Sequence, residues 1–257
     1  MRGIALSCCE HCGLLGTTHF VTRFKSPDGL YDVNQNNLDV YQEYYLQHRL
    51  RLYAKFLPRL GKFRKTNRLL EVGSGYGYFL KMSSDAGWDS EGVEISSFCC
   101  KVARQRACKV HQGSLQDVGL IPNVYDVIAL WDVIEHFTQP DEIIALCQTL
   151  LRPGGALLMR TPDARALAST LWPARVAYRH LVYPSNTAEH VFHFRPPDLA
   201  RIVTQCGLRV YETDDVDGWK ERVIAGNNGW VRAGRRWIMR YAQWRAWPYE
   251  FVLISTK

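Results

Sequence analysis

Two patterns of apolar and polar residues alternate along most of the chain. From position 68 onward, short β-rich runs alternate with longer stretches in which apolar residues recur every three or four positions. The short runs predict strands near 68–72, 89–93, 108–111, 125–131 and 155–161. The longer stretches predict helices near 77–86, 96–106 and 139–151. Strands that alternate with helices favour a parallel sheet covered on both faces.

The two ends of the chain extend this pattern. Apolar and aromatic residues recur at threes, fours and sevens over 34–60, which predicts a helix that caps the core, with Pro58 near its end. Runs of alternating apolar residues at 208–213 and 250–256 predict two more strands. We therefore expect an α/β fold: a Rossmann-like, doubly wound, mostly parallel seven-stranded sheet with helices on both faces.

The chain of 257 residues fits one core domain with appended pieces. Residues 1–33 form an N-terminal segment with clustered cysteines, and 34–257 form the domain, which contains two special segments, 162–197 and 215–248. No apolar run reaches the ~18 residues that span a membrane, and the first residues do not resemble a signal peptide. We expect a cytoplasmic protein whose cysteines stay reduced. The net charge of +7 favours anionic partners without deciding the fold.

A glycine-rich loop follows the first strand of the predicted sheet. Gly73, Gly75 and Gly77 permit close backbone approach between strand and helix. A dinucleotide-binding fingerprint would have a third glycine at position 78, which is Tyr78. Glu71 beside the loop suits a ligand with a cationic amine better than a pyrophosphate. About 20 residues on, Glu94 ends the next strand and can accept hydrogen bonds from ribose hydroxyls, so the ligand contains adenosine.

Five motifs follow one another along the chain: LLEVGSGYGYFL at 69–80, EGVEIS at 91–96, GSLQDV at 113–118, YDVIALWDVIEHF at 125–137 and LRPGGALLMRTPD at 151–163. In these motifs the chain resembles the class I S-adenosylmethionine-dependent methyltransferases, in particular the group with the ubiquinone-biosynthesis O-methyltransferases and many sugar and natural-product methyltransferases. The resemblance implies S-adenosylmethionine as cofactor. It covers about residues 41–207.

The same resemblance assigns the cofactor-binding residues. It places Glu71 and the loop residues Gly73, Ser74, Gly75 and Gly77 near the methionine part of the cofactor. Glu94 would hold the ribose, and Ile95 would pack on the adenine. Ser114 and Leu115 would flank the edge of the adenine, and Trp131 would line the pocket at the end of the fourth strand.

Histidines are the candidates for catalysis. Methyl transfer is an in-line displacement that mainly needs alignment, but a hydroxyl acceptor must also lose a proton, for which His is well matched. The candidates are His136, His190 and His193. The last two are preferred, because the run around them resembles a family segment that faces the acceptor. Each also has a purely structural interpretation.

Two groups of residues raise the question of metals. Asp132, Glu135 and His136 are spaced to converge on one helical face, where they could bind a cation, brace the loop or supply a base, and bracing is preferred. Cys8, Cys9 and Cys12 resemble one half of a zinc ribbon that some relatives carry. Because tetrahedral zinc needs four ligands, we interpret the segment as a degenerate remnant and predict no metal.

The insertion at 215–248 combines tryptophans with arginines and suggests a basic amphipathic helix. It could contact a membrane surface, an anionic or lipid-linked acceptor or a partner subunit, or simply pack its tryptophans on the core. RNA binding lacks a recognised module, so no nucleic acid is favoured. The oligomeric state is not determined by the sequence.

The sequence therefore predicts a methyltransferase that uses S-adenosylmethionine, acting on an oxygen of a small-molecule, saccharide or natural-product acceptor selected by 162–197 and 215–248. Nitrogen or carbon acceptors stay open. One rival is a nicotinamide-dependent oxidoreductase, disfavoured by Tyr78. The other is a non-catalytic adapter that retains the cofactor fold.

Overall fold

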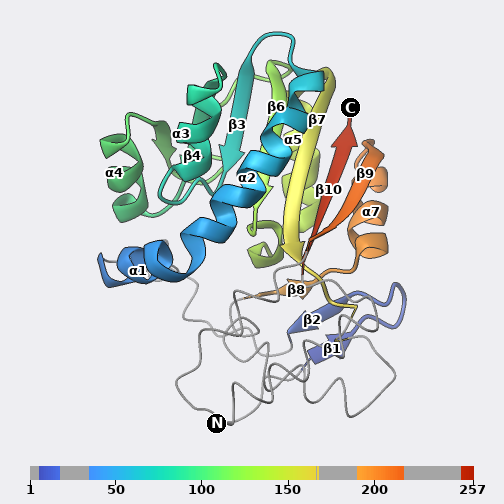
Figure 1. Cartoon of the computed structure of the whole chain (residues 1–257). Coiled ribbons are helices and arrows are strands. Elements are labelled where there is room, and N and C mark those ends of the chain that lie inside the picture. Colours follow the sequence, from blue (N-terminus) through green and yellow to red (C-terminus); the bar gives the residue numbers. More distant parts are fainter. Residues whose placement is uncertain (1–5, 18–34, 166, 168–189, 217–249) are drawn as a thin grey trace.

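The computed structural model of the chain describes residues 6–17, 35–165, 167, 190–216 and 250–257 (Figure 1). Its centre is a seven-stranded sheet with the order β5-β4-β3-β6-β7-β10-β9. The strands are β3 (Arg68–Val72), β4 (Asp89–Glu94), β5 (Lys109–Gln112), β6 (Tyr125–Trp131), β7 (Leu151–Pro162), β9 (Arg209–Val216) and β10 (Glu250–Thr256). Every strand predicted from the sequence is present within a few residues of its expected position.

Neighbouring strands from β5 to β7 run parallel, whereas β10 is antiparallel to both β7 and β9. The strand order reverses direction at β3, because the chain moves outward through β4 and β5 and then returns to place β6 on the other side of β3. The predicted doubly wound, mostly parallel sheet is therefore confirmed. Ligands of such sheets bind where the order reverses, at the carboxyl ends of the strands.

Successive residues of a strand point to opposite sides of the sheet. Both faces therefore carry apolar side chains, and helices cover both faces. Leu69 and Val127 join the apolar core under α2 (Leu46–Leu60), together with Phe79 of α3 (Tyr78–Asp85). Their neighbours Leu70 and Ile128 join the core under α5 (Pro140–Leu150) and α7 (Pro196–Gln205). The α4 helix (Ser97–Gln105) packs beside α3 and β5.

The predicted cap helix is present but is not uniform. It consists of α1 (Gln35–Val40), a π-helical turn (Tyr41–Tyr45) and α2, which continues through Pro58 and ends at Leu60. Phe56 and Leu60 of α2 are fully buried against the sheet. Burial of each such side chain stabilises the fold by about 1.5–3 kcal/mol, so the buried face of α2 as a whole offsets the cost of a proline near its end.

A second, smaller sheet lies below the carboxyl ends of the main strands in Figure 1. The hairpin β1 (Leu6–Cys8) and β2 (Leu15–Thr17) pairs with β8 (Phe192–His193), so the N-terminal cysteine segment contacts the chain 176 residues further on. This contact was not predicted. Most of the segment 162–197 and nearly all of the insertion 215–248 lie outside the described residues, so the predictions for them stay predictions.

In the part of the chain that the structure describes, no helix is both long and apolar enough to span a bilayer.

Candidate functional site

A cavity of about 740 Å³ opens at the carboxyl ends of β3, β4 and β6. Its lining includes most of the predicted cofactor residues: Glu71, Gly73, Ser74, Gly75, Glu94, Ile95, Ser114, Leu115 and Trp131. They lie at or just after the carboxyl ends of β3, β4, β5 and β6, which the parallel arrangement brings to one edge of the sheet. His136 lines the same cavity.

The three loop glycines have different structural roles. Gly73 has φ +68°, and a Cβ atom there would lie 2.5 Å from Cγ2 of Val133. Gly77 has φ +78° at the start of α3, where a Cβ would lie 2.8 Å from the Cβ of Ala103. Gly75 has φ +51°, and its Cβ would meet no protein atom within 4 Å. Gly73 and Gly77 are thus needed for packing, and Gly75 leaves open space in the cavity wall.

Glu94 is held at the end of β4 by backbone amides. Its two carboxylate oxygens accept hydrogen bonds from the N–H groups of Gly75 and Ser96, each at 2.8 Å. Burial nevertheless raises the pKa of Glu94. Gly92 in the same strand is required because a Cβ would lie 2.7 Å from Leu80 and Ser74. The result is a fixed carboxylate beside the glycine loop, with lone pairs left for hydroxyl donors.

Several buried polar atoms of residues on the cavity wall have no hydrogen-bond partner among the residues that the structure describes. They are Glu71 Oε2, Ser74 Oγ, Trp131 Nε1, Asp132 Oδ1 and Arg49 Nη1. Burial, followed by the charge of Glu94, raises the pKa of Glu71 well above its usual range. Buried polar groups are rarely left unpaired, so this wall is built for a polar ligand. Acceptors and a guanidinium donor together suit the ammonium and carboxylate of an amino-acid group.

The sequence did not reveal Arg49, which reaches the cavity from α2. Its guanidinium pairs with Asp132, and the buried Arg160 pairs with both Asp132 and Glu250. Burial opposes the charge on Arg49, but the surrounding acidic groups, Asp132 foremost, together outweigh burial and raise the pKa of Arg49. Asp132 itself has φ +54°, an uncommon conformation for a residue other than glycine and one often found at functional sites. Asp132 is therefore an anchor for two arginines.

Aromatic rings form the rest of the wall. Trp131 is 6% exposed and contacts Tyr53 and Phe79 edge to face, with ring centroids 4.9 and 5.2 Å away. Tyr41, from the π-helical turn, stacks on Tyr78 with centroids 5.9 Å apart. This turn sits where the cap helix meets the cavity, a position at which π-helical turns are frequent in functional sites.

The three predicted catalytic histidines form a chain that leads away from the cavity. His136 lines the cavity, and its ring meets that of His190 with centroids 4.8 Å apart. The ring of His190 lies 5.9 Å from that of His193. His190 and His193 are 4% and 1% exposed, and burial lowers the pKa of His193 to about 4. Of the three, His136 is the one on the cavity wall.

Glu135 directly precedes His136 in the chain and is buried. Burial, followed by the charge of Asp132, raises its pKa to about 8. In the described part of the chain, ligand atoms of Glu135, His136 and His190 converge within 4.8 Å of one another. Asp132, which the sequence grouped with Glu135 and His136, instead faces the two arginines. The prediction that no metal is required stays a prediction.

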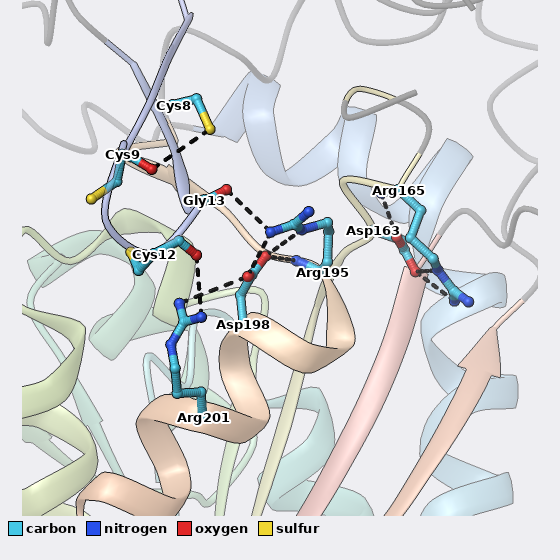
Figure 2. A network of polar contacts seen from close by, with 9 residues as sticks. All are labelled: Cys8, Cys9, Cys12, Gly13, Asp163, Arg165, Arg195, Asp198 and Arg201. Carbon is cyan, nitrogen blue, oxygen red and sulfur yellow. Dashed lines mark hydrogen bonds and ion pairs between the residues drawn. The ribbon is translucent and has the colours of Figure 1, made fainter. Parts of the chain in front are cut away.

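The cysteine hairpin is docked on α7 rather than on the cavity. Arg195, the N-cap residue of α7, donates to the carbonyl oxygen of Gly13 at 3.1 Å, and Arg201 of α7 donates to that of Cys12 at 3.2 Å (Figure 2). Hydrogen bonds from the backbone and thiol of Cys12 lower the pKa of Cys9. The interpretation of this segment as a degenerate zinc ribbon is untested by these contacts.

The chain matches a family model described as "Methyltransferase domain" over residues 45–213. Among curated proteins, it is 27% identical to a ubiquinone biosynthesis O-methyltransferase of Thiobacillus denitrificans over 179 residues, which are 66% of this chain and 73% of that protein. It is 26% identical to the protein of that name from Burkholderia pseudomallei over 154 residues, 56% of this chain and 66% of the relative. The match thus spans about two thirds of the length of the latter relative.

Solved structures share the fold. A SAM-dependent methyltransferase from Archaeoglobus fulgidus superposes with a TM-score of 0.58 at 19% identity, covering 81% of this chain and 94% of that one. A phosphoethanolamine N-methyltransferase of Haemonchus contortus, in complex with phosphomonomethylethanolamine and S-adenosylhomocysteine, gives 0.64 at 16% identity, covering 90% and 60%. These findings agree with the cavity, whose carboxylates and open glycine backbone suit S-adenosylmethionine.

Proposed function

Since the chain belongs to the methyltransferase domain family and uses S-adenosylmethionine as methyl donor, we propose that it methylates a hydroxyl oxygen of a small-molecule acceptor, of a saccharide or natural-product kind. The observation that carries the proposal is an imidazole, His136, on the wall of the cavity that contains the cofactor-binding carboxylates. A hydroxyl acceptor needs a base far more than a neutral amine does.

Two groups would hold the amino-acid part of the donor. Glu71 Oε2 would accept a hydrogen bond from the ammonium and Arg49 Nη1 would donate one to the carboxylate, which would satisfy two atoms without a partner in the described part of the chain. Glu94 would accept from the ribose hydroxyls, while the backbone N–H groups of Gly75 and Ser96 hold its carboxylate in place. Ile95 and Leu115 supply apolar contact for the adenine, Ser114 lies at its edge, and Trp131 closes the inner wall.

When bound, S-adenosylmethionine would supply an electrophilic methyl group to the acceptor oxygen, with the neutral thioether as the leaving group. His136 would take the proton that the acceptor hydroxyl loses. His190 packs edge to face on His136 and limits the orientations its ring can adopt. We assign His136 as the base, with His190 and His193 as its supports.

Acceptor selection by 162–197 and 215–248, contact of the insertion with an anionic or lipid-linked acceptor, and a cytoplasmic location are further parts of this proposal. Their support is the sequence pattern. The relatives are named ubiquinone biosynthesis O-methyltransferases. Their name supports oxygen methylation as the class of reaction and nothing finer for this chain.

The experiment is a methyl-transfer assay with labelled S-adenosylmethionine against phenols, catechols, sugars and primary amines. Labelled methyl ethers formed by the wild type, and lost in Gly75→Arg, support the proposal. Calorimetry comes first: binding of S-adenosylmethionine shows that the protein is folded and can bind its donor. Binding of NAD in its place would favour the oxidoreductase alternative. Transfer to amines with none to hydroxyls contradicts the proposed oxygen acceptor, and binding of the donor without transfer to any acceptor favours the adapter.

A further inference from the structure

The N-terminal hairpin reaches the histidine chain through one side chain, that of Thr17. The Thr17 hydroxyl donates a hydrogen bond to the carbonyl oxygen of His190 at 2.7 Å. The same oxygen lies 3.1 Å from Nε2 of His193. Because the hydroxyl has a single hydrogen and a carbonyl can only accept, the hydroxyl must accept from His193. Nε2 of His193 therefore carries the hydrogen.

Backbone contacts place this hydroxyl rigidly. The N–H of Thr17 donates to the carbonyl of Val191 at 3.0 Å, and Gly16 pairs with Phe192 in the small sheet. On its other side, the N–H of Val191 donates to the carbonyl of Glu135 at 2.9 Å. The segment that carries His190 is thus held between β2 and the turn that carries His136.

The opposite end of the hairpin is also fixed. Arg195 is oriented by two hydrogen bonds to the buried Asp198, at 2.7 and 2.8 Å, and it donates to the carbonyl of Gly13 (Figure 2). Arg201 donates to the carbonyl of Cys12. Hydrogen bonds from charged donors are stronger than those between neutral groups, so these two contacts dock the turn on α7 and on the residue that precedes it. The hairpin behaves as a brace between α7 and the histidine segment.

We propose that Thr17 is a positioning residue for methyl transfer: it holds His190 against His136 and selects the Nε2–H tautomer of His193. The inference rests on the proposed function, in which His136 removes the acceptor proton. Thr17 is not among the residues that line the cavity, and its side-chain contacts described above are with His190 and His193, so it acts through the histidines.

The matched variants are Thr17→Val, which keeps the shape and loses both hydrogen bonds, and Thr17→Ser, which keeps the hydroxyl. We expect Thr17→Val to lower kcat about 10-fold to 100-fold, since small misplacements of catalytic groups have effects of that size. The dissociation constant of S-adenosylhomocysteine should stay within about twofold, because the cavity does not include the hairpin. Thr17→Ser should retain most of kcat. Ser7→Ala, which removes a hydroxyl from the exposed part of the same hairpin, should change nothing.

Long-range proton–nitrogen NMR of histidine-labelled protein reads the tautomer directly. The wild type should show His193 protonated on Nε2, and Thr17→Val should show a mixture of tautomers. An Nδ1-protonated His193 in the wild type overturns the inference even if Thr17→Val fails to fold. An unchanged kcat in folded Thr17→Val overturns it whatever the spectrum shows, and so does a Thr17→Ser variant as impaired as Thr17→Val. If His136→Asn retains full activity, the proposed function fails separately, because the NMR result does not depend on activity.

Discussion

The rings of His136 and His190 meet edge to face, with their centroids 4.8 Å apart. His136 belongs to the turn after β6 and lines the cavity, whereas His190 precedes β8 and is 4% exposed. The pair joins the cofactor side of the molecule to the small sheet. We therefore expect a substitution of one histidine to change the position of the other ring.

His136→Asn should lower kcat by about 100-fold or more, because a positioned base contributes that much to proton transfer. The dissociation constant of S-adenosylmethionine should change little. Steady-state kinetics and calorimetry measure the two effects. His111→Asn is the matched control, since His111 lies on β5, contacts Glu91 of β4 and is not on the cavity wall. A full retention of kcat in His136→Asn would remove His136 as the base.

Donor binding should release a proton. Burial and the charge of Glu94 raise the pKa of Glu71 in the free protein, so its carboxyl holds a proton where an exposed glutamate would not. The donor's ammonium favours the charged carboxylate and lowers that pKa again. Binding should therefore tighten as pH rises toward the pKa of the free protein. Calorimetry in buffers of different ionisation enthalpy counts the released protons.

In Glu71→Gln, proton release should disappear and affinity should fall at least about tenfold, because a charged hydrogen bond is replaced by a neutral one. Equal proton release in the variant and the wild type would show that another group is responsible.

A comparison of Gly73→Ala with Gly75→Ala should separate an effect on stability from an effect on donor binding. At Gly73 the new methyl group would collide with Val133 at 2.5 Å in a left-handed conformation, so we expect a loss of about 1–3 kcal/mol of stability. At Gly75 the methyl group has space, and the left-handed conformation alone costs about 1–2 kcal/mol. Gly75→Ala should instead weaken donor binding. Thermal unfolding and calorimetry test the pair, and wild-type affinity in Gly75→Ala would mean that the donor does not approach this backbone.

We expect the ionisation of Glu91 to make the stability of the protein depend on pH in the acid range. Its buried carboxylate is surrounded by Arg68, Lys109, His111 and Tyr125, with contacts of 2.7–2.8 Å. Burial alone would raise the pKa of Glu91, but these donors outweigh it and lower the value to about 2. A lowered pKa adds stability above the unfolded value near 4.5, and that stability is lost as pH falls from about 4.5 to about 2.

Glu91→Gln should therefore destabilise the protein by about 2–3 kcal/mol at neutral pH and remove this acid dependence. Asp85→Asn is the control, because Asp85 forms an exposed ion pair with Lys81 that is worth under about 0.5 kcal/mol. Urea unfolding at several pH values measures both. Parallel pH profiles for Glu91→Gln and the wild type would contradict the assignment.

Removal of divalent cations should leave methyl transfer unchanged, because the described chemistry needs only a base and an aligned donor. Dialysis against a chelator, followed by addition of Mg²⁺, Mn²⁺ or Zn²⁺ one at a time, is the measurement. A loss that one cation restores would assign Glu135, His136 and His190 as its ligands, since their ligand atoms lie within 4.8 Å of one another.

Much of the fold and of the donor site could be predicted from the sequence. Short apolar runs and amphipathic stretches located the strands and helices, because burial on one or both faces leaves a period in the sequence. Glu71 and Glu94 could be found because parallel strands end at the same edge, so residues at successive strand ends must meet. Gly92 was missed, although its steric requirement is as strict as that of Gly73.

By itself, the sequence determined which residues face the core and which strand ends form the donor site, since both follow from local periodicity and from the geometry of a parallel sheet. Only the tertiary structure decided that Arg49 lines the donor cavity and that Asp132 forms ion pairs with Arg49 and Arg160. The same is true of the hydrogen bonds that link Thr17 with His190 and His193. Thr17 and His193 are 176 positions apart. A periodic pattern records that a side chain is buried but not which distant side chain it meets, because that partner is chosen by the packing of whole elements.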